Sequence, residues 1–355
     1  MLGANAQTSV LGARAGAEAI NEAGGIGGRP VEITVVDDGG DATVAVTKLR
    51  EAIASDARPD AYMNSGPSNL AAATLPILTQ NEILSFNIGP TENSADPAVF
   101  PLNFDLSPSP QDMISGFVAH IRENGHGSVG IIHGSSAYGE TFGTVAEEGL
   151  SAAGIDVVGT EEYDVAALDM TPQLQALRAR NPQALVVDGY GAPLGYLLQS
   201  MEKLGWEIPL LGNTSVSATG LVSTEPPAGL LGTPLVEPLL MQVYTSTAYD
   251  PAAEKVNRMV ERMTALGPIP ASLILAYNYD AFFLLAAAAR DAGSTEAAAL
   301  AAALEKPEVQ RDAGTAVLPL YNFTASAHAP QVGADALTFV APSKVVNGQF
   351  ATPVP

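Results

Sequence analysis

Residues 184–211 read ALVVDGYGAPLGYLLQSMEKLGWEIPLL, and this stretch decides the fold class. The run ALVVD at its start, apolar up to its last residue, is typical of a buried strand, and residues 193–204 place apolar side chains at helical spacing. The run IPLL at the end predicts a second strand. A strand, a helix and another strand in this order predict two parallel strands joined by a right-handed crossover.

The same alternation of strands and helices extends in both directions from this stretch. We expect strands over 31–36, 60–64, 83–87, 128–133, 156–160, 184–188 and 208–211, and helices over 13–22, 42–54, 140–153, 172–180 and 193–204, with further helices beginning near Ser68 and Pro110. No repeat with a period of about 20 to 50 residues is present, which excludes solenoids and propellers. The sequence therefore predicts an α/β protein with doubly wound parallel sheets.

Three extended, proline-rich passages interrupt this alternation, at residues 100–110, 229–240 and 317–322. A single interruption would separate two tandem domains, whereas three favour a chain that crosses three times between two lobes. We therefore predict an N-terminal lobe of residues 1–105 and 238–318, and a C-terminal lobe of residues 106–237 and 319–355. Ordinary loops containing proline are the alternative explanation of the same passages.

The composition excludes several classes of function. The chain has 355 residues with 47% hydrophobic side chains, no cysteine, and 38 acidic against 16 basic residues, a net charge of -22. Without cysteine there are no disulfides, thiolate metal sites or cysteine nucleophiles. A charge this negative repels phosphate backbones, so we expect no nucleic-acid partner. No apolar run is long enough to span a bilayer, and no signal peptide is visible.

The clearest enzyme-like signal is the turn GYGAPLG at residues 189–195, which follows a predicted strand and opens a predicted helix. Its spacing is GxGxxxG, and the next strand ends in Gly212-Asn213-Thr214 without the acid that would hold a ribose. The four histidines (His120, His126, His133 and His328) lack the spacing of metal ligands. We find no catalytic constellation, so we expect no enzyme activity and no cofactor.

Polar loops follow two neighbouring predicted strands, at Ser65–Asn69 and Asn87–Thr91. Backbone N–H groups and hydroxyls at the start of a helix suit a carboxylate or another small polar ligand. In an open α/β sheet, ligands bind at the carboxyl ends of the strands. Ser68 and Thr91 as plain helix N-caps are the simpler explanation of either loop alone.

A series of motifs in a fixed order resembles a known family. The motifs are GAR at 12–14 leading to AINEAGGIGGR at 19–29, VVDD at 35–38, SAYG at 136–139, LDMTPQL at 168–174, LGW at 204–206 before IPL at 208–210, and the YNF of 321–323 leading to His328. In this order they resemble the type I periplasmic binding proteins of the leucine/isoleucine/valine-binding group, which deliver substrates to ABC transporters. The similarity covers almost the whole chain.

The resemblance implies a set of ligand-binding residues, which are Ser68, Asn69, Gly89, Thr91, Tyr138, Tyr190 and Thr214. Amino-acid binders of the family carry an acid at the position of Thr214, where it pairs with the ammonium group of the ligand. A buried ammonium without such a partner would be strongly destabilised. Either Glu92 or Asp280 therefore replaces that acid, or the ligand is not an α-amino acid.

The resemblance also implies a function and its partners. We expect an extracytoplasmic, periplasmic component of an ABC importer, which binds a small carboxylate or amino acid between its lobes by hinge closure. ABC permease subunits would be its partners, and we expect a monomer. The alternatives are a ligand-sensing receptor of the same fold that regulates a partner protein, and a nucleotide-dependent α/β enzyme built around residues 189–195.

One departure from the family lies at the start of the chain. Family members open with an apolar strand and a Thr-Gly-Pro turn before the equivalent of residues 1–5, and here that strand is missing together with a signal peptide. Because the strand would be central in its sheet, we expect its loss to leave a groove with unpaired backbone groups. A truncated sequence is our expectation, and a cytoplasmic sensor of the same fold is the alternative.

Overall fold

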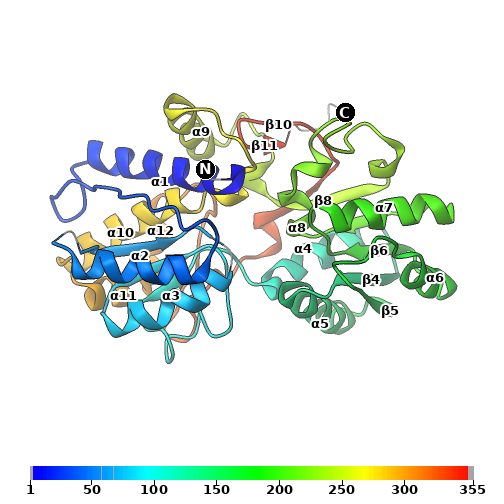
Figure 1. The fold of residues 1–355 in the computed structure, drawn as a ribbon, viewed down its shortest axis with the longest axis horizontal. Coiled ribbons are helices and arrows are strands. Elements are labelled where there is room, and N and C mark those ends of the chain that lie inside the picture. Colours follow the sequence, from blue (N-terminus) through cyan, green and yellow to red (C-terminus); the bar gives the residue numbers. More distant parts are fainter. Residues whose placement is uncertain (1–2, 57, 67, 351–355) are drawn as a thin grey trace. The chain divides into compact units, whose positions relative to one another are not determined.

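The computed structural model describes residues 3–56, 58–66 and 68–350, and the chain forms two compact units (Figure 1). Unit 1 consists of Met1–Ser109 and Pro251–Val332, and unit 2 consists of Pro110–Asp250 and Gly333–Pro355. The chain therefore passes three times from one unit to the other. Both units combine helices with mainly parallel strands, which confirms the predicted α/β class.

Unit 2 is built on a six-stranded sheet in the order β5-β4-β6-β7-β8-β9, in which only β8 and β9 are antiparallel. Its strands are β4 (Ser128–Gly134), β5 (Asp156–Tyr163), β6 (Ala184–Val187), β7 (Leu210–Gly212), β8 (Leu239–Tyr244) and β9 (Leu337–Val340). Its helices are α4 (Pro110–Glu123), α5 (Ala137–Ala152), α6 (Thr171–Ala179), α7 (Ala192–Leu204) and α8 (Thr214–Ala218). The short antiparallel pair β10 (Val345–Val346) and β11 (Gln349–Phe350) completes the unit.

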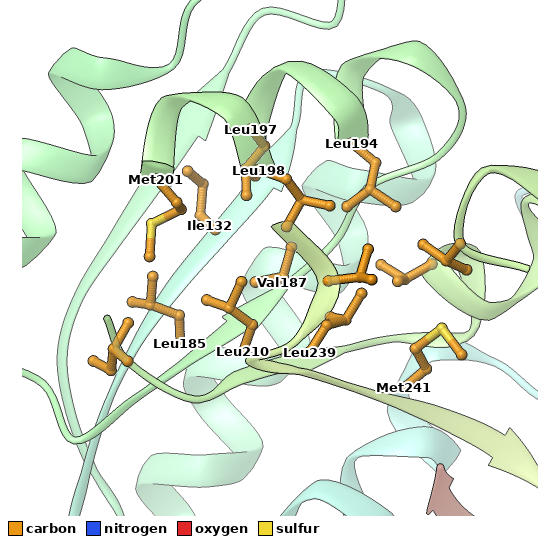
Figure 2. Close-up of a cluster of buried hydrophobic side chains, with 14 of the residues drawn as sticks. Ile132, Leu185, Val187, Leu194, Leu197, Leu198, Met201, Leu210, Leu239 and Met241 are labelled. Atoms are coloured by element: carbon orange, nitrogen blue, oxygen red, sulfur yellow. The ribbon is translucent and has the colours of Figure 1, made fainter. Parts of the chain in front are cut away.

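Both faces of this sheet are buried, as the residues of β6 show. Leu185 and Val187 belong to the hydrophobic cluster that includes the apolar side chains of α7 (Figure 2). Ala184 and Val186 belong to a second cluster, with side chains of α4 and α5. Successive residues of a strand point to opposite faces, so a strand that is covered on both faces needs no polar position. This explains why the run ALVV is continuously apolar.

Unit 1 contains a smaller parallel sheet in the order β1-β2-β3. Its strands are β1 (Ala61–Asn64), β2 (Leu84–Asn87) and β3 (Asn103–Asp105). Its helices are α1 (Ala4–Glu22), α2 (Ala42–Ala54), α3 (Ser68–Gln80), α9 (Glu254–Leu266), α10 (Asn278–Ala292), α11 (Ala297–Leu304) and α12 (Pro307–Ala313). Gly16 lets α1 approach α10 closely, because a Cβ there would lie 2.7 Å from the carbonyl oxygen of Tyr279. No helix in the described part of the chain is long and apolar enough to span a membrane.

The strand predicted over residues 31–36 does not form. The side chain of Asn21 bonds both backbone groups of Val31, but the backbone of 32–36 makes no hydrogen bond with any described residue. Val36 is 51% exposed. A run of β-branched residues favours extended backbone, but a strand also needs a neighbouring strand with which to pair. The prediction of a strand here is therefore wrong.

Three segments lie in a different unit from the lobe that the sequence predicted, and the first of them is residues 106–109, which belong to unit 1. β8 pairs with β7 in parallel, so residues 238–250 belong to unit 2. Residues 319–332 belong to unit 1, where the ring of Phe323 packs edge-on against Phe104 with the ring centroids 5.1 Å apart. Prolines indicate where a loop lies, but they do not indicate which sheet the next segment joins.

Candidate functional site

The seven residues that the sequence singled out all lie where a strand ends or the following helix begins. Ser68, Asn69, Gly89 and Thr91 belong to unit 1, at the loops after β1 and β2, and Tyr138, Tyr190 and Thr214 belong to unit 2, after β4, β6 and β7. Within each unit these strands are parallel, so their carboxyl ends share one edge of the sheet. This edge is where α/β sheets bind ligands.

In unit 1, two asparagine side chains hold the loops that carry the predicted residues. Asn64 ends β1, and its Oδ1 accepts a hydrogen bond of 3.2 Å from the Gly66 N–H. Asn87 ends β2, and its side chain bonds both the N–H and the C=O of Gly89, each at 2.9 Å. A 3.0 Å hydrogen bond from Asn64 Nδ2 to Asn87 Oδ1 joins the two asparagines. The two loops are thus held in one hydrogen-bonded frame.

The side chains displayed by these loops differ in exposure. Ser68 and Asn69, the first two residues of α3, are exposed, and Thr91 is half-buried. The backbone N–H of Thr91 donates a 3.0 Å hydrogen bond to Ser94 Oγ. A hydroxyl and an amide at an exposed helix start are able to bond a small polar ligand, as the sequence indicated.

A buried acid, Asp105, lies at the end of β3 beside these asparagines. Its Oδ1 accepts hydrogen bonds of 3.0 Å from both Asn87 and Asn103, and its Oδ2 accepts one of 2.6 Å from Ser94. Burial raises the pKa of Asp105 to about 6, although these three hydrogen bonds oppose the shift. The sequence analysis did not single out this residue.

In unit 2, Tyr138 and Thr214 are brought together around Met113 of α4. The Thr214 hydroxyl lies 3.0 Å from Met113 Sδ, and the Tyr138 hydroxyl lies 3.9 Å from the same sulfur. Burial raises the pKa of Tyr138 to about 12, so its hydroxyl keeps its proton and can act as a donor. Thr214 is only 6% exposed, so it offers little surface to a ligand in this structure.

A second buried acid, Asp188, directly follows β6 and lies next to this pair. Its Oδ2 accepts a 3.3 Å hydrogen bond from the Gly134 N–H, and its backbone carbonyl accepts one of 3.0 Å from the Tyr163 hydroxyl. Burial raises the pKa of Asp188, while hydrogen bonds from Asn213 and Gly134 oppose the shift. An acid therefore lies in unit 2 close to Thr214, at a position that the sequence analysis left out.

Tyr190 lies on the turn between β6 and α7 and is 53% exposed. Gly191, the N-cap of α7, has a φ of 62°, a left-handed conformation that favours glycine. The glycines of 189–195 thus make a tight turn in front of a helix, which accounts for the glycine-rich motif.

Asp280 is not free to pair with a ligand ammonium. Its carboxylate is fully buried and accepts hydrogen bonds from the N–H groups of residues 316–318 and from the Tyr321 hydroxyl. The proposal that Asp280 replaces the acid missing at Thr214 is therefore wrong. Glu92, the other candidate, is exposed on the loop after Thr91.

The residues missed by the sequence analysis share one signal. Asn64, Asn87, Asp105, Asp188 and Asn213 are each a polar residue that ends a strand or directly follows it. This pattern is visible in the sequence, but it shows neither the register of the strands nor the bonds between the side chains. Among residues 3–56, 58–66 and 68–350, no group of three or more histidine, aspartate or glutamate side chains could hold a metal ion.

Comparisons with known proteins agree on one fold. Residues 2–335 match a family model described as periplasmic binding protein. No curated protein matches the chain. Similar solved structures include a type 1 periplasmic binding protein from Bordetella pertussis Tohama I, with 22% identity, a TM-score of 0.72, and coverage of 94% of this chain and 91% of that chain.

Two further solved structures carry more specific descriptions. One is an ABC transporter substrate-binding protein from Desulfitobacterium hafniense in complex with Leu, with 22% identity, a TM-score of 0.64 and 83% of each chain covered. The other is an amino acid ABC transporter substrate-binding protein from Pseudomonas fluorescens Pf-5, with 19% identity, a TM-score of 0.65, and coverage of 82% of this chain and 76% of that chain. At these identities the likeness concerns the fold.

Proposed function

Because this chain belongs to the periplasmic binding protein family, we propose that it is the extracytoplasmic solute-binding component of an ABC importer. Its ligand in this proposal is a small carboxylate or an amino acid, and the permease subunits of the importer are its partners. The observation that carries the proposal is that both units present hydroxyl, amide and phenol groups at the carboxyl ends of their parallel strands.

Unit 1 supplies the part of the site that suits a carboxylate. The start of α3 at Ser68 offers a hydroxyl and backbone N–H donors, and Thr91 adds a second hydroxyl; such donors favour an anionic oxygen. The asparagine frame of Asn64 and Asn87 holds both loops before a ligand arrives. Groups that are held in place in advance lose less entropy when the ligand binds.

Unit 2 supplies the part of the site that contacts the body of the ligand. The phenol of Tyr138 and the exposed ring of Tyr190 would contact the ligand from this side, while the neutral Thr214 is buried beside Tyr138 with its hydroxyl on Met113. In this proposal, ligand binding favours a closed conformation of the protein. A permease would recognise that conformation.

The charge of the ligand depends on the acids near Thr214. Asp280 is committed to the backbone of residues 316–318, and Asp188 is already hydrogen-bonded to Asn213 and Gly134. Neither acid is left as an unpaired partner for an ammonium group. We therefore expect carboxylates without an α-ammonium to bind at least as tightly as the branched-chain amino acids.

The decisive experiment is a thermal-shift screen of amino acids, their deaminated analogues and NAD, followed by calorimetry on the hits. A ligand at about 1,000 times its Kd stabilises the folded protein by ~4 kcal/mol, which is readily seen as a shift in Tm. Stabilisation by a carboxylate or an amino acid supports the proposal. Stabilisation by NAD alone would favour a nucleotide-dependent enzyme instead.

A further inference from the structure

A single row of polar side chains crosses the sheet of unit 1 at its carboxyl edge. The strand register pairs Asn64 with Asn87, and Asn87 with Asp105. All three side chains are buried. The row ends at Asp105, whose strand β3 lies at one edge of the sheet, and β1 forms the other edge.

The carboxylate at the end of the row determines which way each amide points. A carboxylate only accepts hydrogen bonds, so Asn87 must turn its Nδ2 toward Asp105, and this bond is 3.0 Å long. The Oδ1 of Asn87 then faces the other way, where it accepts from Asn64 Nδ2 and from the Gly89 N–H. Asn64 in turn directs its own Oδ1 to the Gly66 N–H. The orientations of the Asn87 and Asn64 amides therefore depend on Asp105, and these amides bond the backbone of both loops.

A second branch runs from Asp105 to Thr91. Ser94 Oγ lies 2.6 Å from Asp105 Oδ2 and 2.8 Å from the Thr91 carbonyl, and its single proton can be donated to either; the same oxygen accepts a 3.0 Å hydrogen bond from the Thr91 N–H. The side chain of Asn103 also bonds Asp105 Oδ1 and, at 2.9 Å, the Ser94 carbonyl. Asp105 thus connects to three backbone N–H groups of the proposed site, those of Gly66, Gly89 and Thr91.

We infer that Asp105 is a positioning residue for the ligand, whose ionised carboxylate orients the Asn87 and Asn64 amides and thereby holds the backbone of the two loops that carry Ser68 and Thr91. This inference rests on the proposed function, because the loops are those that we propose to bind the ligand. Asp105 itself is buried behind them and does not touch the ligand.

A consequence is that the loops respond to the protonation of Asp105. A protonated carboxyl becomes a donor, so either Ser94 accepts from Asp105 and turns its own proton to the Thr91 carbonyl, or Asn87 must turn. The titratable groups of the segments packed nearby are His328, whose carbonyl accepts from the Asp105 N–H, and Glu305, which lies 3.1 Å from His328 Nε2. Glu92 and Asp96, on the neighbouring loop, are exposed.

The first test needs no ligand and uses the whole chain. The ¹H and ¹⁵N shifts of the Gly66, Gly89 and Thr91 amides are followed by NMR from pH 4.5 to 8. We expect all three to titrate with one shared midpoint, equal to that of the Asp105 carboxyl carbon. The Asp105→Asn variant should abolish this titration, and the control Asp280→Asn, a buried acid that is not bonded to the loops, should leave it in place. Amides that do not move while Asp105 titrates would overturn the inference.

The second test separates orientation from simple structural support. We expect Asp105→Ala to weaken binding of the tightest ligand found by calorimetry by about tenfold or more, whereas Asp105→Asn, which keeps an acceptor for Asn87, stays within about threefold of wild type. Equal losses in both variants would contradict the positioning role. If wild type binds neither leucine nor 4-methylpentanoate, nor any other acid of the panel, the proposed function fails, and the NMR titration still decides the role of Asp105.

Discussion

Asp188 and Asn213 are bonded across the ends of two neighbouring strands of unit 2. Asp188 Oδ1 accepts a 2.8 Å hydrogen bond from Asn213 Nδ2, while Asn213 Oδ1 accepts from the N–H groups of Ser215 and Val216. The side chain of Asn213 therefore both donates to Asp188, the acid that follows β6, and caps helix α8, which begins at Thr214. The position of Thr214 depends on both of these bonds.

Asn213→Ala should destabilise unit 2. The variant loses the cap of α8, about 1 kcal/mol, and removes one of the hydrogen bonds to the buried Asp188, about 1 to 3 kcal/mol more. Urea unfolding followed by circular dichroism measures the sum. Asn124→Ala is the matched control, because Asn124 is exposed in the same unit and should change stability by less than about 0.5 kcal/mol. Equal losses in both variants would show that the Asp188–Asn213 bond contributes nothing.

Ser68→Ala and Thr91→Ala should each weaken ligand binding by about 1 to 3 kcal/mol, as expected when a hydrogen bond to a charged group is lost. Their stability should remain close to that of wild type, since Ser68 is exposed and Thr91 half-buried. Calorimetry measures the affinity. Thr47→Ala, an exposed threonine of α2 in the same unit, should leave it unchanged. Wild-type affinity in both site variants would remove these residues from the site.

Tyr190→Ala should lower ligand affinity without lowering stability. Because the residue is 53% exposed, its removal costs little packing, but it takes away an aromatic surface from the proposed site. Tyr249→Ala provides a closely matched control, since Tyr249 is 52% exposed in the same unit. Both variants should melt near the wild-type Tm, and only Tyr190→Ala should bind more weakly. A ligand-bound structure with the ligand far from Tyr190 would contradict this role.

Asp280 should make stability depend on pH. Burial raises its pKa from 3.8 to about 6, so the folded protein holds this proton more tightly than the unfolded chain does. The contribution of Asp280 is therefore full below pH 3.8 and is lost as the pH rises through about 6. The advantage of wild type over Asp280→Asn in unfolding free energy should shrink with rising pH in this window, by at most ~1.4 kcal/mol per pH unit. An advantage that is constant from pH 4.5 to 7.5 would contradict the shift.

The neutral side chain of Thr214 should make the site prefer ligands without an ammonium group. We expect 4-methylpentanoate to bind wild type at least as tightly as leucine, because a buried ammonium would lack an acid partner. Thr214→Glu should shift the ratio of the two affinities toward leucine. Because general damage to the site would weaken the binding of both ligands, the ratio isolates the effect of the added acid. If leucine binds wild type tenfold or more tightly than its deaminated analogue, another acid holds the ammonium, and Glu92 is the first to test.

Local pattern was sufficient for most of the secondary structure. The helix predicted over 42–54 forms with the same bounds, and the apolar run of 184–188 corresponds to β6 at Ala184–Val187. Both depend on interactions close in sequence, such as the Asp41 cap that begins α2, or on a burial pattern visible in the residues themselves. The run at 31–36 failed because a strand also needs a partner, and no local signal supplies one.

The family resemblance and the candidate residues could also be read from the sequence, since the motifs follow one another in a fixed order. The arrangement of the acidic side chains could not be predicted from the sequence. Asp280 becomes a structural residue through backbone groups 36 to 38 positions away, and Asp105 meets Asn87 and Asn64 only because β1, β2 and β3 pair in that register. Residue type and the local spacing of apolar residues determined the helices and strands, and the kinds of polar groups at their ends. The tertiary structure alone decided which of those groups bond to each other, because strand order and register depend on contacts between distant parts of the chain.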